Sequence, residues 1–299
     1  MRTVFLGTSD FAVAVLRRLA ESEHRPALVV SRPDRPRGRG RRMGAPPVAE
    51  AARELGLELL QPDSVNDESA RERIGAAAPD AVCVCAFGAL IKEPLLSEHL
   101  MLNVHPSLLP RWRGAAPIER AIMAGDAETG VSIMRVTAGL DSGPVCLQGP
   151  EPIRPDDTYG SLAPRLEALG GELLVRTLDT SPPFEEQDDE AATYADKIGS
   201  ADRTLDPARP AAELERTVRA LHPHIGARLA LPGGDWLGVH AAAVADPPDS
   251  PAAGDLVTDA GRLLFACASG ALELRVVQPP GGRPMDAAAY LRGHRLARS

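Results

Sequence analysis

The sequence has no long uncharged apolar run of the kind that crosses a membrane. A membrane-spanning helix needs about 18 or more consecutive apolar residues, and no stretch of this chain reaches that length. The apolar run near the N-terminus ends at Gly7, and it is shorter than the roughly 7–15 residues of a signal-peptide core. These absences predict a cytoplasmic protein with no membrane partner.

Cysteine is also scarce, and its spacing excludes the common zinc-binding motifs. The four cysteines are Cys83, Cys85, Cys146 and Cys267, and no two of them have the C-x-x-C spacing of a zinc site. Cys83 and Cys85 fall on one face of an expected buried strand. Reduced thiols pack as small apolar residues in a cytoplasmic protein. We therefore expect four unpaired cysteines and no bound metal.

Lysine is almost absent, so arginine carries nearly all of the positive charge. The net charge is −8, which by itself disfavours a nucleic-acid partner. The charge is uneven, however, because the segment from Arg32 to Arg42 holds six arginines and one aspartate. Its local charge is +5, which leaves −13 on the rest of the chain. Such a segment suits phosphate contacts, although a solvated basic loop without a partner has the same pattern.

Two nucleotide-binding signatures are missing from a sequence that otherwise alternates strand and helix signals. Strand-like runs at 3–6, 27–31 and 80–86 alternate with helical patterns such as 11–20. This order predicts an open, mostly parallel α/β sheet with right-handed crossovers. The turn after the first run contains Gly7 alone rather than G-x-G-x-x-G, and no G-x-x-x-x-G-K-[ST] motif is present. Bound NAD or FAD is therefore disfavoured.

The second half of the chain has a different pattern, which predicts two further regions. Residues 181–205 begin with an acidic, proline-containing stretch that is poor in apolar residues, as in a linker. Beyond it, a helical pattern at 211–221 precedes five or six short β-like runs separated by Pro and Gly turns. That number of short strands predicts a small barrel. We expect an α/β domain at 1–180, a linker at 181–205 and a small β-barrel at 206–299.

The densest polar cluster lies around a further predicted strand, at residues 101–105. Asn103 and His105 stand two residues apart on it, so their side chains project from the same face. They lie at its carboxyl end, where open α/β sheets bind their ligands, and Pro106 and Pro110 confine the following loop. An amide beside an imidazole suits stabilisation of a carbonyl oxygen whose carbon is under attack. A strand-end histidine that caps a turn explains the pattern equally well.

A second loop supplies a carboxylate. Asp141 lies in the Gly-rich segment 139–143, where glycine allows the backbone to approach a ligand closely. An aspartate there can orient or charge His105. From the local pattern alone, a simple turn aspartate is the more common explanation.

Several segments together resemble the methionyl-tRNA formyltransferases, a family that depends on 10-formyltetrahydrofolate. The resemblance covers nearly the whole chain and is most specific in the first half. Its strongest motif is N-V-H-P-S-L-L-P-R-W-R-G-A-A-P-I, which begins at Asn103. The shorter H-P-S-L-L-P and the Asp loop are common to all formyltransferases that use this folate, so they indicate the donor but not the acceptor. The other matching segments are Phe5–Ala12, Pro33–Arg42, Gly125–Val131, Gly139–Gly143, Tyr194–Ile198 and Gln278–Met285.

The resemblance implies a fold, a reaction and a site. The fold is a Rossmann-like formyltransferase sheet followed by an OB-like barrel that binds tRNA. The reaction transfers a formyl group from 10-formyltetrahydrofolate to the methionine amine of initiator methionyl-tRNA, for translation initiation, and releases tetrahydrofolate. Asn103, His105 and Asp141 match the catalytic positions, and neither a metal nor a protein partner is implied. The folate pocket is implied to be lined by Phe87, Gly88, Ala89, Leu90, Ile91, Ser107, Leu108, Leu109 and Pro110.

The resemblance also implies a function for the arginine-rich segment. In the family this insertion enters the acceptor stem of the tRNA, and Arg39 matches its most important arginine. The implied tRNA contacts are Arg35, Arg37, Arg39, Arg41 and Arg42.

Other functions remain open on the residues alone. A sugar-nucleotide N-formyltransferase shares the three catalytic residues, but a sugar acceptor has no use for six arginines in one segment. A purine-pathway formyltransferase does not need residues 206–299, and a hydrolase passes the formyl group to water. A non-catalytic RNA-binding protein has no reason to keep all three catalytic residues. His222 and His224 have no third metal ligand at suitable spacing, so a packed turn is expected there.

Overall fold

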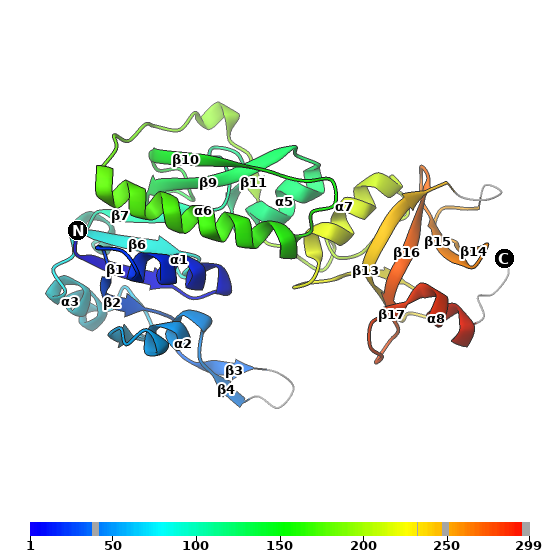
Figure 1. Ribbon diagram of the computed structural model, residues 1–299, viewed down its shortest axis with the longest axis horizontal. Helices are drawn as coiled ribbons and strands as arrows, with labels where there is room; N and C mark the ends of the chain where they lie inside the picture. Colours follow the sequence, from blue (N-terminus) through cyan, green and yellow to red (C-terminus); the bar gives the residue numbers. More distant parts are fainter. Residues whose placement is uncertain (38–41, 232, 247–250, 295–299) are drawn as a thin grey trace. The chain divides into compact units, whose positions relative to one another are not determined.

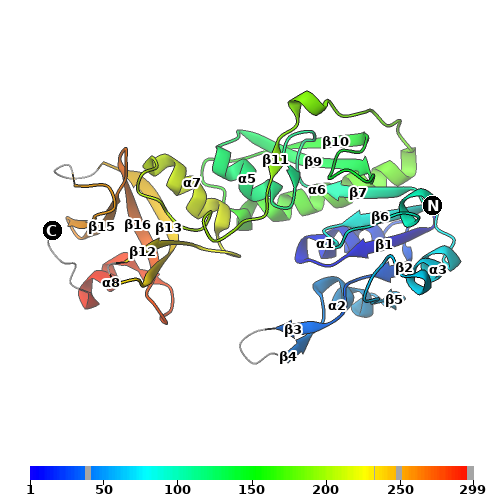
Figure 2. The same cartoon turned by 180° about the vertical axis from the view of Figure 1, so that it is seen from behind.

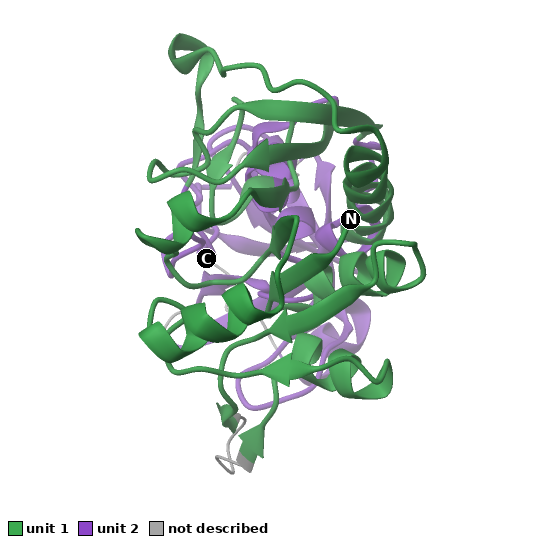
Figure 3. Cartoon of the chain, turned by 90° about the vertical axis from the view of Figure 1, so that its left-hand side faces the viewer, with its two compact units in different colours: residues 1–117, 128–152, 163–195 green, residues 118–127, 153–162, 196–299 purple. Residues whose placement is uncertain are grey.

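A computed structural model of the chain describes residues 1–37, 42–231, 233–246 and 251–294, with the backbone alone at Arg37 and Arg42. The chain forms two compact units (Figure 3): unit 1 is residues 1–117, 128–152 and 163–195, and unit 2 is residues 118–127, 153–162 and 196–299. The units interleave along the chain, whereas the sequence predicts consecutive domains. The boundaries at 180 and 206 stay a prediction, and the first part of the expected linker, residues 181–195, belongs to unit 1.

Unit 1 is built on a seven-stranded sheet with the order β10-β9-β7-β6-β1-β2-β5. Five of its strands pair in parallel, whereas β9 pairs antiparallel with β7 and with β10. The expected mostly parallel α/β sheet is therefore confirmed. The bounds are β1 Thr3–Gly7, β2 Pro26–Val30, β5 Leu59–Leu60, β6 Ala81–Cys85, β7 Met101–His105, β9 Glu128–Arg135 and β10 Val145–Pro152.

The central strands β1 and β6 are apolar except for Thr3, as expected for strands that are covered by the rest of the unit. Every residue of β1 and β6 is buried, as in parallel strands that are covered on both faces. The helix α1 (Asp10–Ala20) buries Phe11, Val15 and Leu19 at helical spacing. Beside it lies α6 (Tyr159–Thr180), which runs along the sheet in Figure 1. A Cβ at Gly170 of α6 would lie 2.9 Å from Val104 of β7, so only glycine allows this close approach.

The remaining elements of the first 195 residues are short. The helices α2 (Pro47–Glu54), α3 (Glu68–Ala76) and α4 (Leu95–Glu98) belong to unit 1. Helix α5 (Pro117–Ala124) belongs to unit 2 except for its first residue. Strands β8 (Arg113–Gly114) and β11 (Tyr194–Ala195) form a parallel pair. The 3-10 helix η1 (Asp189–Ala191) comes just before β11 in the chain. The strands β3 (Arg35–Arg37) and β4 (Arg42–Gly44) form an antiparallel pair that extends beyond α2 in Figures 1 and 2.

Unit 2 is a β-rich domain built on an antiparallel sheet with the order β12-β13-β16-β15-β14, in which β17 pairs with β16. In the described part of the unit no pairing joins β12 to β14, so the closed barrel expected from the sequence is not found. Closure depends on how two edge strands meet, which the local strand pattern does not encode. The bounds are β12 Ala227–Ala230, β13 Trp236–Ala245, β14 Leu256–Asp259, β15 Arg262–Ala266, β16 Ala271–Gln278 and β17 Met285–Asp286.

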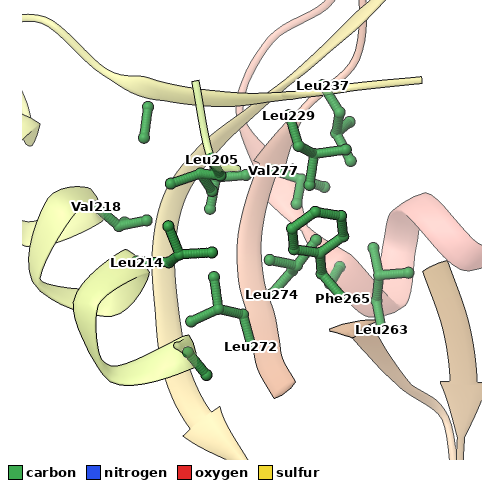
Figure 4. Packing of buried hydrophobic residues seen from close by; sticks show 14 of the residues in the cluster. Leu205, Leu214, Val218, Leu229, Leu237, Leu263, Phe265, Leu272, Leu274 and Val277 are labelled. Atoms are coloured by element: carbon green, nitrogen blue, oxygen red, sulfur yellow. The ribbon is translucent and has the colours of Figure 1, made fainter. Parts of the chain in front are cut away.

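A leucine-rich core joins the helices of unit 2 to its sheet (Figure 4). Helix α7 (Ala211–Leu221) contributes Leu214 and Val218, and the sheet contributes Leu229, Phe265 and Leu272. Helix α8 (Ala287–Gly293) adds further apolar residues to the same cluster. Each fully buried side chain of this kind stabilises the fold by about 1.5–3 kcal/mol, so helices and sheet form one core.

The four cysteines are free thiols. Cys83 and Cys85 are fully buried in β6, whereas Cys146 and Cys267 are only partly buried. Burial raises the pKa of the Cys83 thiol to about 12 and also raises the pKa of Cys85. Within the described ranges, no helix combines the length and apolarity that crossing a bilayer requires.

Candidate active site

Strand β7 presents two polar side chains near its carboxyl end. Asn103 and His105 occupy alternate positions, so both project from the same face. β7 lies between β6 and β9, and His105 pairs with Ser132 of β9. His105 is 4% exposed, whereas Asn103 is partly accessible. The sheet therefore fixes the imidazole and leaves part of Asn103 open to solvent.

Both ring nitrogens of His105 face oxygen atoms. Nε2 lies 2.9 Å from the backbone carbonyl oxygen of Trp112. Because a carbonyl oxygen can only accept, this nitrogen carries a hydrogen. Nδ1 lies 3.6 Å from Oδ2 of Asp141, which is within ion-pair range but longer than a hydrogen bond. The backbone thus holds Nε2, and Nδ1 is the nitrogen that remains for chemistry.

The loop that carries Asp141 has an unusual backbone conformation. Asp141 has a φ of 46°, in the left-handed region that aspartate tolerates better than most non-glycine residues. Its Oδ2 accepts a 2.9 Å hydrogen bond from the N–H of Gly114, and the same oxygen forms the ion pair with His105. The structure therefore brings His105 and Asp141 together through one carboxylate oxygen, while their catalytic roles stay a prediction.

Asn103 projects from the same face of β7 as His105. Among the described residues, its side-chain amide has no hydrogen-bond partner. An amide in this state offers two donor hydrogens and one acceptor oxygen to a ligand. Its catalytic role also stays a prediction.

The loop after β7 is fixed by hydrogen bonds from two neighbouring strands. Ser107 is fully buried, and its hydroxyl donates to the Arg111 carbonyl at 2.6 Å. The hydroxyl of Ser132 on β9 donates to the Ser107 carbonyl at 2.6 Å and accepts from the N–H of Leu109 at 3.0 Å. The amide of Gln148 on β10 donates to the Leu109 carbonyl at 2.8 Å. The sheet therefore determines the shape of this loop.

Exposure divides the residues expected to line a folate pocket into two groups. The accessible group contains Gly88, Ala89, Leu90, Leu108 and Pro110, of which Leu90 is 68% exposed. The buried group contains Phe87, Ile91, Ser107 and Leu109. Phe87 and Ile91 pack into the same core cluster as the residues of β1 and β6, so they anchor their loop. The accessible group alone offers surface to a ligand, and its contact with folate stays a prediction.

Comparison with known proteins identifies the family. A family model described as formyl transferase matches residues 1–178, and one described as formyl transferase, C-terminal domain, matches residues 197–295. A methionyl-tRNA formyltransferase from Halorhodospira halophila is 45% identical over 301 residues, which cover 99% of this chain and 97% of that protein. One from Methylococcus capsulatus is 44% identical over 304 residues, which cover 99% and 98%. The chain belongs to the methionyl-tRNA formyltransferase family.

Solved structures share the fold at low sequence identity. HypX from Aquifex aeolicus, in complex with tetrahydrofolic acid, has a TM-score of 0.66 at 17% identity and covers 97% of this chain and 47% of that chain. An N-formyltransferase from Helicobacter canadensis, in complex with folinic acid and dTDP-3-aminofucose, has a TM-score of 0.66 at 12% identity and covers 92% of this chain and 99% of that chain. At these identities the likeness concerns the fold alone.

The arginine-rich segment of this member of the methionyl-tRNA formyltransferase family includes paired strands. Arg35 on β3 pairs with Gly44 on β4, and Arg37 pairs with Arg42. The side chain of Arg35 is exposed. Arg39 and Arg41 lie outside the described residues, so the tRNA contacts expected from the family stay a prediction.

The base of this hairpin is held by a side chain from another loop. The amide of Gln61 donates to the Arg32 carbonyl at 2.9 Å and to the Asp34 carboxylate at 2.8 Å. Arg32 in turn donates to the carbonyl of Gly88, in the segment after β6. The hairpin is thereby tied to one of the two loops that are expected from the sequence to line a folate pocket.

Sequence reasoning missed the residues that hold the active-site loops. Ser132 and Gln148 stand opposite each other on β9 and β10, and the only local signal was a polar residue inside the apolar run V-S-I-M. Gln187 donates to the backbone of Asp141, 46 residues away in the chain. No local pattern connects residues at that separation.

The two histidines considered above as metal ligands pack within unit 2. Nε2 of His224 lies 2.9 Å from Oε1 of Glu119, and its ring stacks on Tyr159 with the centroids 3.7 Å apart. Within the described part of the chain, buried Nδ1 of His222 has no hydrogen-bond partner, and burial lowers the pKa of His222. Among the described residues, no three His, Cys, Asp or Glu side chains are arranged to hold a metal ion.

Proposed function

We propose that this chain transfers the formyl group of 10-formyltetrahydrofolate to the α-amino group of methionine on initiator methionyl-tRNA, in the cytoplasm, for the initiation of translation. The observation that carries the proposal is the 3.6 Å approach of His105 Nδ1 to Asp141, on the strand that also presents Asn103. Relatives at 44–45% identity over nearly the whole chain have this enzyme's name.

The described residues fit a folate co-substrate. The Asn103 amide is free to bind a carbonyl oxygen, and the loops after β6 and β7 offer Leu90, Leu108 and Pro110 as accessible apolar surface. Pockets for planar ligands combine such surface with a few placed polar groups. Bound 10-formyltetrahydrofolate supplies a formyl carbon on N10, from which tetrahydrofolate leaves.

Asn103 and His105 stabilise the negative charge that develops on the formyl oxygen. As the methionine amine attacks the formyl carbon, the electron pair of the C=O bond moves onto that oxygen. The Asn103 amide and protonated Nδ1 of His105 both donate to it, as in an oxyanion hole. The Trp112 carbonyl, 2.9 Å from Nε2, leaves Nδ1 as the donating nitrogen.

Asp141 faces Nδ1 of His105 and accepts a proton in the reaction. Its carboxylate takes the proton that the amine loses as the new N–C bond forms. The His105–Asp141 pair then returns a proton to N10 as the C–N10 bond breaks. The proton count balances, and tetrahydrofolate leaves as a neutral amine.

The basic hairpin and unit 2 supply the tRNA-binding surfaces. The +5 charge between Arg32 and Arg42 suits contacts with acceptor-stem phosphates, whose strength falls as salt rises. We assign these contacts to Arg35, Arg37, Arg39, Arg41 and Arg42. Unit 2 is proposed to be an OB-like tRNA-binding domain, and its antiparallel sheet and its match to the C-terminal formyl transferase domain support this.

One experiment tests the reaction and the acceptor together. The purified chain is incubated with formyl-labelled 10-formyltetrahydrofolate and with initiator methionyl-tRNA, elongator methionyl-tRNA, uncharged tRNA, a dTDP-amino sugar or buffer. The proposal expects label on initiator methionyl-tRNA alone. Label on the sugar nucleotide, free formate in buffer, or no transfer in any arm contradicts it.

A further inference from the structure

Residues 181–195, which we call the strap, bind both loops that complete the candidate active site. The strap follows α6, contains η1 and ends in β11, and all of it belongs to unit 1. Its Glu185 forms an antiparallel bridge with Val145 of β10, and Figures 1 and 2 show the strap beside that strand. The strap is therefore bound to the sheet of unit 1 and is not a free connecting segment.

The end of the strap holds the loop around Trp112. The N–H of Trp112 donates to the Thr193 hydroxyl at 2.9 Å, and the N–H of Arg113 donates to the Thr193 carbonyl at 2.8 Å. This loop provides the carbonyl that binds Nε2 of His105 and the Gly114 N–H that binds the Asp141 carboxylate. The strap thus positions the groups that orient the catalytic pair.

The middle of the strap holds the loop that carries Asp141. The amide nitrogen of Gln187 donates to the Asp141 carbonyl at 2.9 Å and to the Gly143 carbonyl at 2.6 Å. Both of its hydrogens are therefore engaged with the backbone on either side of Ser142. These bonds hold Asp141 in the left-handed conformation that directs its carboxylate towards His105.

A buried arginine sets the orientation of that amide. Arg113 is 3% exposed, and its Nε–H donates to Oε1 of Gln187 at 3.0 Å, while another nitrogen donates to Asp189 at 2.8 Å. A guanidinium can only donate, so the atom facing it must be the amide oxygen. The amide nitrogen is then directed to the two carbonyls, which can only accept. Burial of an arginine is costly unless its donors are used, and here they are used to fix Gln187.

We propose that Gln187, oriented by Arg113, is a positioning residue for formyl transfer, because it holds the Asp141 carboxylate beside Nδ1 of His105. It touches no reacting atom and acts through Asp141. Its kinetic consequences rest on the proposed function, but the structural part of the inference does not.

Two variants of Gln187 and one control test the inference. Q187L removes all three hydrogen bonds, whereas Q187E keeps an acceptor for Arg113 and loses both donors to the loop. Each is expected to lower kcat for methionyl-tRNA formylation about tenfold to a hundredfold, because misplacement of a catalytic group by about 1 Å costs this much. The KM for 10-formyltetrahydrofolate is expected to change by less than about twofold. The control is D188A, which removes only the cap on Glu190 of η1 and keeps full turnover.

A double-mutant cycle separates positioning from general stability. If Gln187 acts through Asp141, Q187L costs little further turnover in a D141N background, because the group that it positions is already disabled. An additive loss in the double variant, or full kcat in Q187E, overturns the inference.

Hydrogen exchange tests the same inference without enzymatic activity. Backbone amides in 136–145 are expected to exchange faster in Q187L and Q187E than in the wild-type chain and D188A, with global stability compared by thermal unfolding. Equal exchange in this segment overturns the inference even in an active enzyme. If the wild-type chain transfers no formyl group but amides 136–145 still exchange faster in Q187L, the proposed function is wrong and the positioning inference stands. The two failures are therefore distinguishable.

Discussion

The Asp141 carboxylate can be tested by removing its charge and little else. In D141N the amide has the size of the carboxylate, and its oxygen can still accept the hydrogen bond from Gly114. Because the same oxygen position faces Nδ1 of His105, the variant keeps an acceptor there and loses only the negative charge that pairs with a protonated ring.

The size of the effect follows from the distance between the two groups. Unit charges 3.6 Å apart interact by about 4.6 kcal/mol at an effective dielectric of about 20. This is an upper value because the Asp141 side chain is 19% exposed and is screened by solvent. Loss of one oxyanion donor costs roughly 2.7–4 kcal/mol, which is within this limit. We therefore expect kcat to fall about a hundredfold to a thousandfold.

The assay measures steady-state formylation of initiator methionyl-tRNA, with folate affinity measured separately by fluorescence quenching. The matched control is D179N, since Asp179 pairs with another buried histidine of unit 1, His24, at 2.8 Å. D179N loses a pair of the same kind outside the site and is expected to keep its turnover. A D141N enzyme with kcat within about threefold of wild type refutes the reasoning, because loss of several kcal/mol of transition-state stabilisation lowers kcat far more than threefold.

Four further predictions concern other parts of the chain. N103A is expected to lower kcat about a hundredfold or more with folate affinity kept, since it removes an oxyanion donor; near-wild-type turnover excludes Asn103 from the mechanism. G114A is expected to lose about 1–3 kcal/mol of unfolding free energy in thermal or denaturant melts, because Gly114 has a φ of +123° and a Cβ there would lie 2.8 Å from the Ala195 carbonyl oxygen. R39A is expected to raise the KM for methionyl-tRNA without changing folate affinity, and to reduce the slope of log affinity against log salt by about 1; unchanged tRNA kinetics refute that contact. Because burial raises the pKa of Cys83 to about 12, its thiol stays protonated at pH 9, where an ordinary thiol is half ionised, and alkylation by iodoacetamide is expected only after unfolding.

The raised pKa of the Cys83 thiol also predicts how the free energy of unfolding changes with pH. The buried group holds its proton more tightly in the folded state than in the unfolded state, so its contribution is complete below the ordinary value of 9.0. The free energy of unfolding is expected to fall as the pH rises above 9.0 towards about 12. Denaturant titrations at several alkaline pH values measure this slope, and C83A is expected to reduce it.

Local sequence pattern determined the apolar strands β1, β2, β6 and β7 of unit 1 and the common face of Asn103 and His105. Continuous apolar runs mark strands that are covered on both faces, and the period of two in a strand places alternate residues together wherever the strand lies. The identity of the family also followed from the residues, because its motifs are long and run through most of the chain. These features depend on short stretches of sequence alone.

Only the tertiary structure decided which distant residues complete the site and which strands form the edges of each sheet. Asp141, Gly114 and Gln187 meet because three segments that are far apart in the chain pack against one another, and the acidic stretch that resembled a linker is bound there by a buried arginine. The sheet of unit 2 stays open between β12 and β14 in the described residues for a similar reason. Contacts between distant segments depend on how whole elements pack, and this packing leaves no periodic signal in the residues that it joins.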